Sequence, residues 1–126
     1  MEKMINKQTV FLYNVEREKE KQIRILCREL GTDVRKIRPE QTGETIGALM
    51  GLDIKKTIGK DEKISEEIMI LSGFSGDKLD VFLKGYRNKN IEPVKLKAVV
   101  TGHNISWTVG YLYKELKKET YGEVER

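Results

Sequence analysis

The chain is poor in several residue types that mark particular classes of protein. Among its 126 residues there are one cysteine, one histidine and two prolines. A single cysteine excludes an internal disulfide, and a single histidine excludes a metal site built from two or three histidines. Two prolines leave little room for a proline-rich linker. The remaining composition, with 38% apolar residues and 11 glycines, is that of an ordinary globular domain.

Long apolar runs and blocks of like charge are missing as well. No run of about 18 apolar residues occurs, so no segment is long enough to span a membrane as a helix. The N-terminus lacks the apolar core of a signal peptide. The 24 basic and 20 acidic residues are interspersed, which indicates a solvated surface rather than a basic arm for nucleic acid. We therefore expect a single cytoplasmic domain, with its core at about 8–119 and flexible tails at 1–7 and 120–126.

Eight segments show the periodicity of a strand or a helix. Short apolar or charged extended runs predict strands at 9–14, 33–38, 67–72 and 96–101. Amphipathic spacing predicts helices at 16–30, at 41–52, at about 75–88 and from about 104–106 onward. The expected helix caps are Asn14, Thr42 and Ser75, and the expected helix stops are Gly31 and Gly51. The polar stretch 55–65 is expected to be a mobile loop.

The alternation of strands and helices predicts an α/β fold. We expect a small three-layer, flavodoxin-like arrangement with a four-stranded parallel sheet in the order 2-1-3-4. The charged strand would then lie at an edge. A ferredoxin-like α+β fold with an antiparallel sheet is the alternative, if the helix at 41–52 is only an insert. In the parallel arrangement Asn14, Ser72 and Thr101 would meet at one rim of the sheet, where ligands bind in such folds.

The lead-in to the last helix carries side chains suited to a small anion. These are hydroxyl, imidazole, amide and indole groups, on Thr101, His103, Asn104, Ser106, Trp107 and Thr108. The expected first turn of this helix has no acidic residue, so its N–H groups and dipole would attract an anion, whereas the preceding long helix carries Asp77 in its opening turn. The competing interpretation is that Asn104 or Ser106 only caps the helix, His103 is a solvated loop residue, and Trp107 packs at the sheet edge.

Other chemistries find less support. The turn after the first strand has no glycine and carries Glu16 and Glu18, which would repel the phosphates of a nucleotide. No cofactor motif occurs, and a catalytic triad could use only His103. Cys27 falls on an apolar helix stripe, so we expect a buried thiol rather than a nucleophile. Basic residues surround Tyr86 at Lys84, Arg87, Lys89, Lys95 and Lys97. They lack interleaved aromatics, which favours a solvated edge over a nucleic-acid site.

The C-terminal half carries a recognisable pattern. Its parts are the segment 93–101 with Leu-Lys-Ala and a closing threonine, then Asn104, Trp107 and a charged helix at 112–119. This pattern resembles a small bacterial family from Gram-positive anaerobes, a domain of unknown function. The stretch 46–51 is similar to the middle segment of the same family. The resemblance implies a bacterial cytoplasmic protein and carries no catalytic residue.

Two functions follow from these observations as hypotheses. The first is a non-enzymatic binding or regulatory module that contacts a ligand or a protein through strand-end loops or a sheet edge; its partner would be a small anion or a protein. The second is a protein or enzyme that binds an anion or a phosphorylated metabolite around Thr101, His103 and Asn104. We expect no cofactor, no membrane and no nucleic acid as partner, and homodimerisation stays open.

Overall fold

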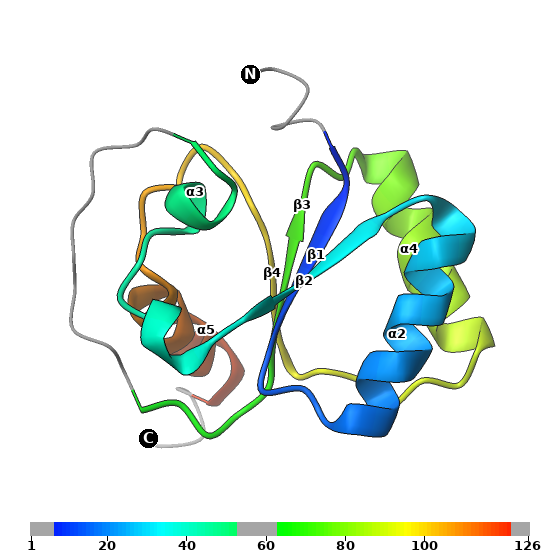
Figure 1. The fold of residues 1–126 in the computed structure, drawn as a ribbon, viewed down its shortest axis with the longest axis horizontal. Coiled ribbons are helices and arrows are strands. Elements are labelled where there is room, and N and C mark those ends of the chain that lie inside the picture. Colours follow the sequence, from blue (N-terminus) through cyan, green and yellow to red (C-terminus); the bar gives the residue numbers. More distant parts are fainter. Residues whose placement is uncertain (1–6, 53–62, 122–126) are drawn as a thin grey trace.

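A computed structural model describes residues 7–52 and 63–121 (Figure 1). The elements in chain order are β1 (Thr9–Tyr13), α2 (Arg17–Leu30), β2 (Asp33–Ile37), the 3₁₀ turn η1 (Pro39–Gln41), α3 (Ile46–Leu49), β3 (Ile68–Ser72), α4 (Gly76–Asn88), β4 (Leu96–Val99) and α5 (Val109–Tyr121). Within the described ranges no helix has the length and apolarity to cross a membrane. Most of the expected loop 55–65 and of the expected tails lies outside these ranges, although α5 continues two residues beyond the expected core.

The four strands form one sheet in the order β2-β1-β3-β4, as the sequence predicts. β1 pairs with β2 in parallel, and β3 pairs with β4 in parallel. The two central strands, however, run antiparallel, with Phe11 opposite Ile70 and Tyr13 opposite Ile68. The sheet is therefore mixed. The prediction of a wholly parallel sheet is wrong, and so is the wholly antiparallel alternative.

The reversal arises in the connection between β2 and β3. β2 ends at the rim where β1 ends, whereas Met50, just after α3, lies at the opposite rim beside Ser72 and Gly73. A strand that entered the sheet from there would run parallel to β1. β3 instead begins at the rim where β1 ends, so Met50 and Ile68 lie at opposite rims of the sheet.

Helices cover both faces of the sheet. Figure 1 shows α2 and α4 side by side on one face and α3 and α5 on the other. Every residue of β1 and β3 is buried, which confirms two strands covered on both sides. Alternate side chains of β1 point to opposite cores: Val10 and Leu12 contact the α2–α4 side, while Phe11 and Tyr13 contact the α3–α5 side.

Local chemistry determines where α2 and α4 start and where α2 ends. Ser75 caps α4 and Gly31 ends α2 in the left-handed conformation, both as predicted. The cap of α2 is Glu16, however, not Asn14. Asn14 instead turns the chain after β1 with a φ of 57°.

The two helices on the other face begin later than predicted. α3 is capped by Thr45 rather than Thr42, because the Thr45 side chain accepts a hydrogen bond from the N–H of Ala48. α5 begins at Val109 rather than near 104–106, and the Thr108 hydroxyl accepts from the N–H of Tyr111 at 3.0 Å. The short segment before α5 forms turns.

Two βαβ segments make up the molecule and are related by an approximate two-fold axis. We call β1, α2, β2 and α3 the first unit (residues 9–49), and β3, α4, β4 and the start of α5 the second unit (residues 68–112). Both units join their strands in parallel, and they meet antiparallel at the centre of the sheet. The axis passes between Phe11 and Ile70, which lie opposite each other.

Backbone conformations follow the same symmetry. The residue after each central strand has a positive φ, 57° at Asn14 and 79° at Gly73. A positive φ also follows each helix, 70° at Gly31 directly after α2 and 55° at Asn90 two residues after α4. From the central strand to the end of its helix, residues 59 positions apart are therefore structurally equivalent.

Candidate functional site

The carboxyl ends of the strands lie at two opposite rims of the sheet. Ser72 and the segment leading to Thr101 follow β3 and β4 at one rim, whereas Asn14 follows β1 at the other. The expectation that all three meet at one rim is wrong, because the central strands are antiparallel. We call the first of these the open rim (Ser72, Ser75, Lys78 and Thr101) and the second the closed rim (Asn14, Glu16, Lys19 and Glu67).

The open rim holds a pocket of about 580 Å³. Its lining combines polar and apolar side chains with two glycines: Ser72, Ser75, Lys78, Thr101, Met50, Phe74, Val100, Ile105, Gly73 and Gly102. Among the described residues, the lining contains one charged side chain, that of Lys78, and no carboxylate. A pocket with one cation, three hydroxyls and an apolar wall suits a small amphiphilic anion.

The loop from β3 to α4 places backbone N–H groups beside this pocket. Gly73 turns the chain with a φ of 79°, a conformation that glycine adopts without strain. Ser75 then caps α4, and its hydroxyl accepts from the N–H of Lys78 at 3.4 Å. In the described part of the chain, the N–H groups of Gly76 and Asp77 have no protein acceptor. Asp77 is exposed and does not line the pocket, so its charge opposes an anion only from the solvent side.

The closed rim has the same architecture, but there a carboxylate of the protein itself lies at the start of the helix. The Glu16 carboxylate accepts hydrogen bonds from the N–H groups of Glu18 at 2.8 Å and Lys19 at 3.1 Å. These two backbone donors hold the pKa of Glu16 below its ordinary value. The start of α2 is thus occupied by a carboxylate of its own cap.

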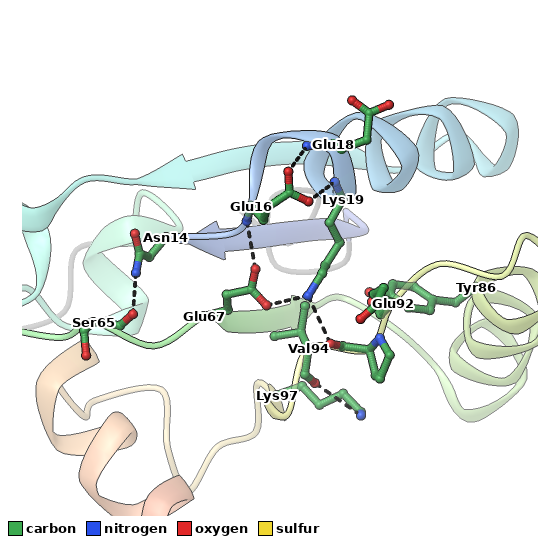
Figure 2. Close-up of polar contacts among 11 residues, drawn as sticks. Asn14, Glu16, Glu18, Lys19, Ser65, Glu67, Tyr86, Glu92, Val94 and Lys97 are labelled. Atoms are coloured by element: carbon green, nitrogen blue, oxygen red, sulfur yellow. Dashed lines mark hydrogen bonds and ion pairs between the residues drawn. The ribbon is translucent and has the colours of Figure 1, made fainter.

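A second carboxylate completes this arrangement, and Figure 2 shows it reaching across from the start of β3. Glu67 accepts from the N–H of Glu16 at 2.8 Å and from Nζ of Lys19 at 2.5 Å. Nζ of Lys19 also donates to the carbonyl of Pro93 at 3.2 Å. The side chains of Lys19 and Glu67 are 11% and 25% exposed, so the pair is largely shielded from water. We call Glu16, Lys19 and Glu67 the clasp.

The two-fold relation shows what the open rim lacks. Three positions of the clasp have equivalents there: Glu16 corresponds to Ser75, Lys19 to Lys78, and Glu67 to Gln8. The lysine is retained and both carboxylates are gone. Gln8 accepts from the Thr32 hydroxyl at 2.9 Å. Lys78 is exposed, and among residues 7–52 and 63–121 no carboxylate or carbonyl contacts its ammonium group.

The residues expected to bind an anion separate into two groups. Thr101 lines the open-rim pocket. Its hydroxyl accepts from the N–H groups of His103 at 3.2 Å and Asn104 at 3.3 Å. The Asn104 side chain closes the same turn, with its oxygen accepting from Thr101 N–H at 2.9 Å and its nitrogen donating to the Val99 carbonyl at 3.0 Å. Thr101 and Asn104 therefore stabilise the wall of the pocket.

The other expected residues lie outside the pocket. Trp107 is the centre of an aromatic cluster, with ring centroids 5.1 Å from His103 and 4.9 Å from Tyr111, both edge to face. Ser106 is exposed, and Thr108 caps α5. None of these four side chains lines the open-rim pocket.

The start of α5 cannot supply the N–H groups that the anion hypothesis required. Val109 donates to the Glu44 carbonyl at 3.0 Å, and Gly110 donates to the Thr42 carbonyl at 2.9 Å. Tyr111 donates to Thr108. The donors are taken by the protein itself, so this part of the expectation is wrong.

Sequence reasoning placed Ser72 at a ligand-binding rim but missed Ser75 and Lys78 on the β3–α4 side of the pocket. A signal was present, because Ser72 begins a stretch that reads Ser-Gly-Phe-Ser-Gly between a strand and a helix. Glycine-containing turns that open a helix are a common form of anion site. Asp77 in the opening turn concealed this signal.

Two other side chains were singled out in the sequence. Cys27 is fully buried, as expected, and burial raises the pKa of its thiol to about 12, so it stays protonated and unreactive. Tyr86 is also buried, with its hydroxyl donating to the Glu92 carbonyl at 2.6 Å. Its ring is therefore not available to stack against a nucleic-acid base.

Comparison with known proteins identifies one family. Residues 67–120 match a domain of unknown function, DUF3783. This match runs from the start of β3 into α5 and so covers the second unit. It confirms the resemblance of the C-terminal half to a domain family without an assigned function. No curated protein and no solved structure matches the chain.

Proposed function

We propose that this protein is a binding module for a small carboxylate- or phosphate-bearing ligand, which it takes in the open-rim pocket. The observation that supports this most directly is the clasp. There, the N–H of Glu16 and the ammonium of Lys19 hold the carboxylate of Glu67. Ser75 and Lys78 are the equivalents of the two donors, and no carboxylate of residues 7–52 or 63–121 lies between them.

Electrostatics favour an anion at this position. The start of α4 carries a partial positive charge, and its N–H groups at Gly76 and Asp77 have no acceptor among the described residues. The Lys78 ammonium adds a full charge at the pocket lining. Hydrogen bonds from charged donors to carboxylate or phosphate are about twice as strong as neutral ones. The hydroxyls of Ser75 and Thr101 supply further polar contacts.

The apolar part of the lining points to a ligand that is more than a bare ion. Met50, Phe74 and Ile105 line the same pocket. An organic acid or phosphate ester would place its charge at Lys78 and its carbon skeleton against these side chains. The described part of the lining contains no histidine, cysteine or carboxylate that could act as a base beside its hydroxyls. This supports binding rather than catalysis.

Of the two kinds of partner that the sequence suggests, these contacts favour a small anion over a protein. The support for a protein partner is the cluster of His103, Trp107 and Tyr111, in which Tyr111 is 49% exposed. That cluster lies outside the pocket. We regard it as a separate surface.

A titration of the ¹⁵N-labelled chain with inorganic phosphate and with malonate tests the proposal. Shifts of amide resonances are expected at 75–78 and 101–102, with saturation in the millimolar range or tighter. Lys78→Ala is expected to weaken binding at least about fivefold, because it removes one charge-assisted hydrogen bond. Lys84→Ala is the matched control, since Lys84 is exposed on the same helix and does not line the pocket.

Two results would overturn the proposal. One is the absence of amide shifts at 75–78 with about 20 mM of either anion. The other is an equal loss of affinity in Lys78→Ala and Lys84→Ala, because a general effect of surface charge is the same for both lysines.

A further inference from the structure

We infer that the surface by which the second unit contacts the first is a two-fold surface that fits a second copy of the second unit. In the natural chain, the first unit takes the place of that second copy. The partner that fits this surface is therefore another copy of the second unit. The inference does not depend on the proposed ligand. It rests on the contacts by which the two units meet.

Hydrogen bonds between the units are reciprocal. Ile46 N–H donates to the Trp107 carbonyl at 2.9 Å, and Val109 N–H donates to the Glu44 carbonyl at 3.0 Å. A second pair repeats the pattern one residue on. Gly47 N–H donates to Ile105 at 2.8 Å, and Gly110 N–H donates to Thr42 at 2.9 Å. In an isologous interface each contact occurs twice with the partners exchanged, as it does here.

The sequence at this contact is repeated too. Residues 45–49 read Thr-Ile-Gly-Ala-Leu, and residues 108–112 read Thr-Val-Gly-Tyr-Leu. The threonines form an antiparallel bridge with each other, and each caps the helix that follows it. Two unrelated helix starts would not be expected to share this sequence, this capping residue and this pairing. The repeat indicates that the units are two forms of one structure.

The axis crosses all three layers. It passes between Thr45 and Thr108 on one face and between the central strands in the sheet. On the other face it passes between Leu26 and Gly85, which are equivalent positions on α2 and α4. A Cβ atom at Gly85 would lie 2.8 Å from Cδ1 of Leu26, so the space at the axis holds one large side chain. Two copies of the second unit would place glycine opposite glycine, which leaves a cavity but no overlap.

Charge complementarity also favours pairing of the second unit with itself. Glu67, just before β3, belongs to the clasp at the closed rim. In a symmetric pair, each Glu67 would reach the Ser75 N–H and the Lys78 ammonium of the other copy, which correspond to the Glu16 N–H and Lys19. The pair would therefore contain two clasps, where the natural chain has one. At the open rim of the natural chain, Gln8 stands at the position of Glu67.

A tandem chain tests this directly. Residues 8–49 are replaced by a second copy of 67–112, with residues 50–66 kept as the connection and Gly85→Leu in the first copy to fill the axis. The expected product is a monomer by light scattering that unfolds cooperatively. Most pairs of equivalent residues should give one amide resonance instead of two.

The matched control is the same tandem with Val109→Pro in both copies. Proline is tolerated at the first position of a helix, so this change removes the N–H that bonds across the axis while leaving the helix start acceptable. The control is expected to lose cooperative unfolding. A tandem that folds equally well with and without these N–H groups, or that shows one folded and one unfolded copy, overturns the inference.

If the tandem chain does not fold, exchanging the two residues at the axis of the natural chain tests the inference. Leu26→Gly and Gly85→Leu are each expected to lower the melting temperature, by opening a cavity and by overlap respectively. The double variant, like the parent, has one glycine and one leucine at these two helix positions, so the two changes in helix propensity cancel. Recovery of the melting temperature to within about 5 °C of the parent supports equivalent faces, whereas additive losses overturn the inference.

Discussion

The closed and open rims share one backbone plan and differ at two of the three clasp positions, where serine and glutamine replace glutamate. At the closed rim, carboxylates from two segments neutralise Lys19 and occupy the start of α2. At the open rim, serine and glutamine stand in the equivalent positions, and Lys78 faces a pocket. The comparison shows that the residue at the helix start matters more than the backbone. At α2 a carboxylate of the protein bonds the first N–H groups and helps to hold the structure together, whereas at α4 a serine stands in its place and we expect an outside anion to bind.

The closed rim is also bound to the segment that leads into β3. Tyr13 donates its hydroxyl to the Ile64 carbonyl at 3.1 Å, and the Asn14 amide donates to the Ser65 carbonyl at 2.7 Å. Tyr113 on α5 donates to the neighbouring Glu66 at 2.7 Å. These contacts join the segment before β3 to the end of β1 and to α5 at one rim. We therefore expect substitutions there to affect stability, and substitutions at the open rim to affect binding.

The largest predicted effect comes from the two equivalent lysines. Lys19→Ala is expected to lower the free energy of unfolding by about 2–3 kcal/mol, because it leaves Glu67 and the Pro93 carbonyl without their shared donor in a poorly hydrated place. Lys78→Ala is expected to change it by less than about 0.5 kcal/mol, as for an exposed residue. Urea unfolding of both variants measures the difference. Equal losses would contradict the distinction between the rims.

A smaller effect is expected at the threonines on the axis. Thr45→Ala and Thr108→Ala each remove a helix cap, which typically costs about 1 kcal/mol. Since the two positions are equivalent, their losses should agree to within about 0.5 kcal/mol. Urea unfolding again provides the measurement. A loss at one threonine several times that at the other would show that the units do not meet symmetrically.

Much of the fold was predictable because local patterns determine it. The unbroken apolar runs of β1 and β3 indicate strands covered on both sides, and Gly31 and Ser75 mark helix ends by their own chemistry. Strand order followed from which strands are apolar and which is charged. The direction of β3 did not, because it depends on a long connection that reaches the opposite rim at Met50 before β3 begins at the rim where β1 ends.

The candidate site was less predictable, for a related reason. Thr101 was placed correctly beside the third strand end, since β3 and β4 are parallel. The start of α5 was misplaced because Ser106 and Asn104 look like caps in sequence, whereas the cap is selected by the bridge between Thr45 and Thr108. A contact between residues 63 positions apart leaves no local signal. The role of Lys78 emerges only when Lys19 is recognised as its equivalent.

The smallest predicted effect concerns the stability that the two helix caps, Glu16 and Ser75, contribute at different pH. The pKa of Glu16 lies below its ordinary value, because the N–H groups of Glu18 and Lys19 bond its ionised form. The stability that this carboxylate contributes is therefore fully present above the ordinary pKa of a glutamate and is lost as the pH falls through the lowered one. The difference in melting temperature between the parent and Glu16→Gln should be small at pH 7 and vanish in acid. Ser75→Ala, at the equivalent cap, removes a group that does not titrate, so its effect should stay constant over the same range. If the effect of Ser75→Ala varied with pH as strongly as that of Glu16→Gln, a carboxylate would have to act at the open rim as well, and the contrast between the rims would fail.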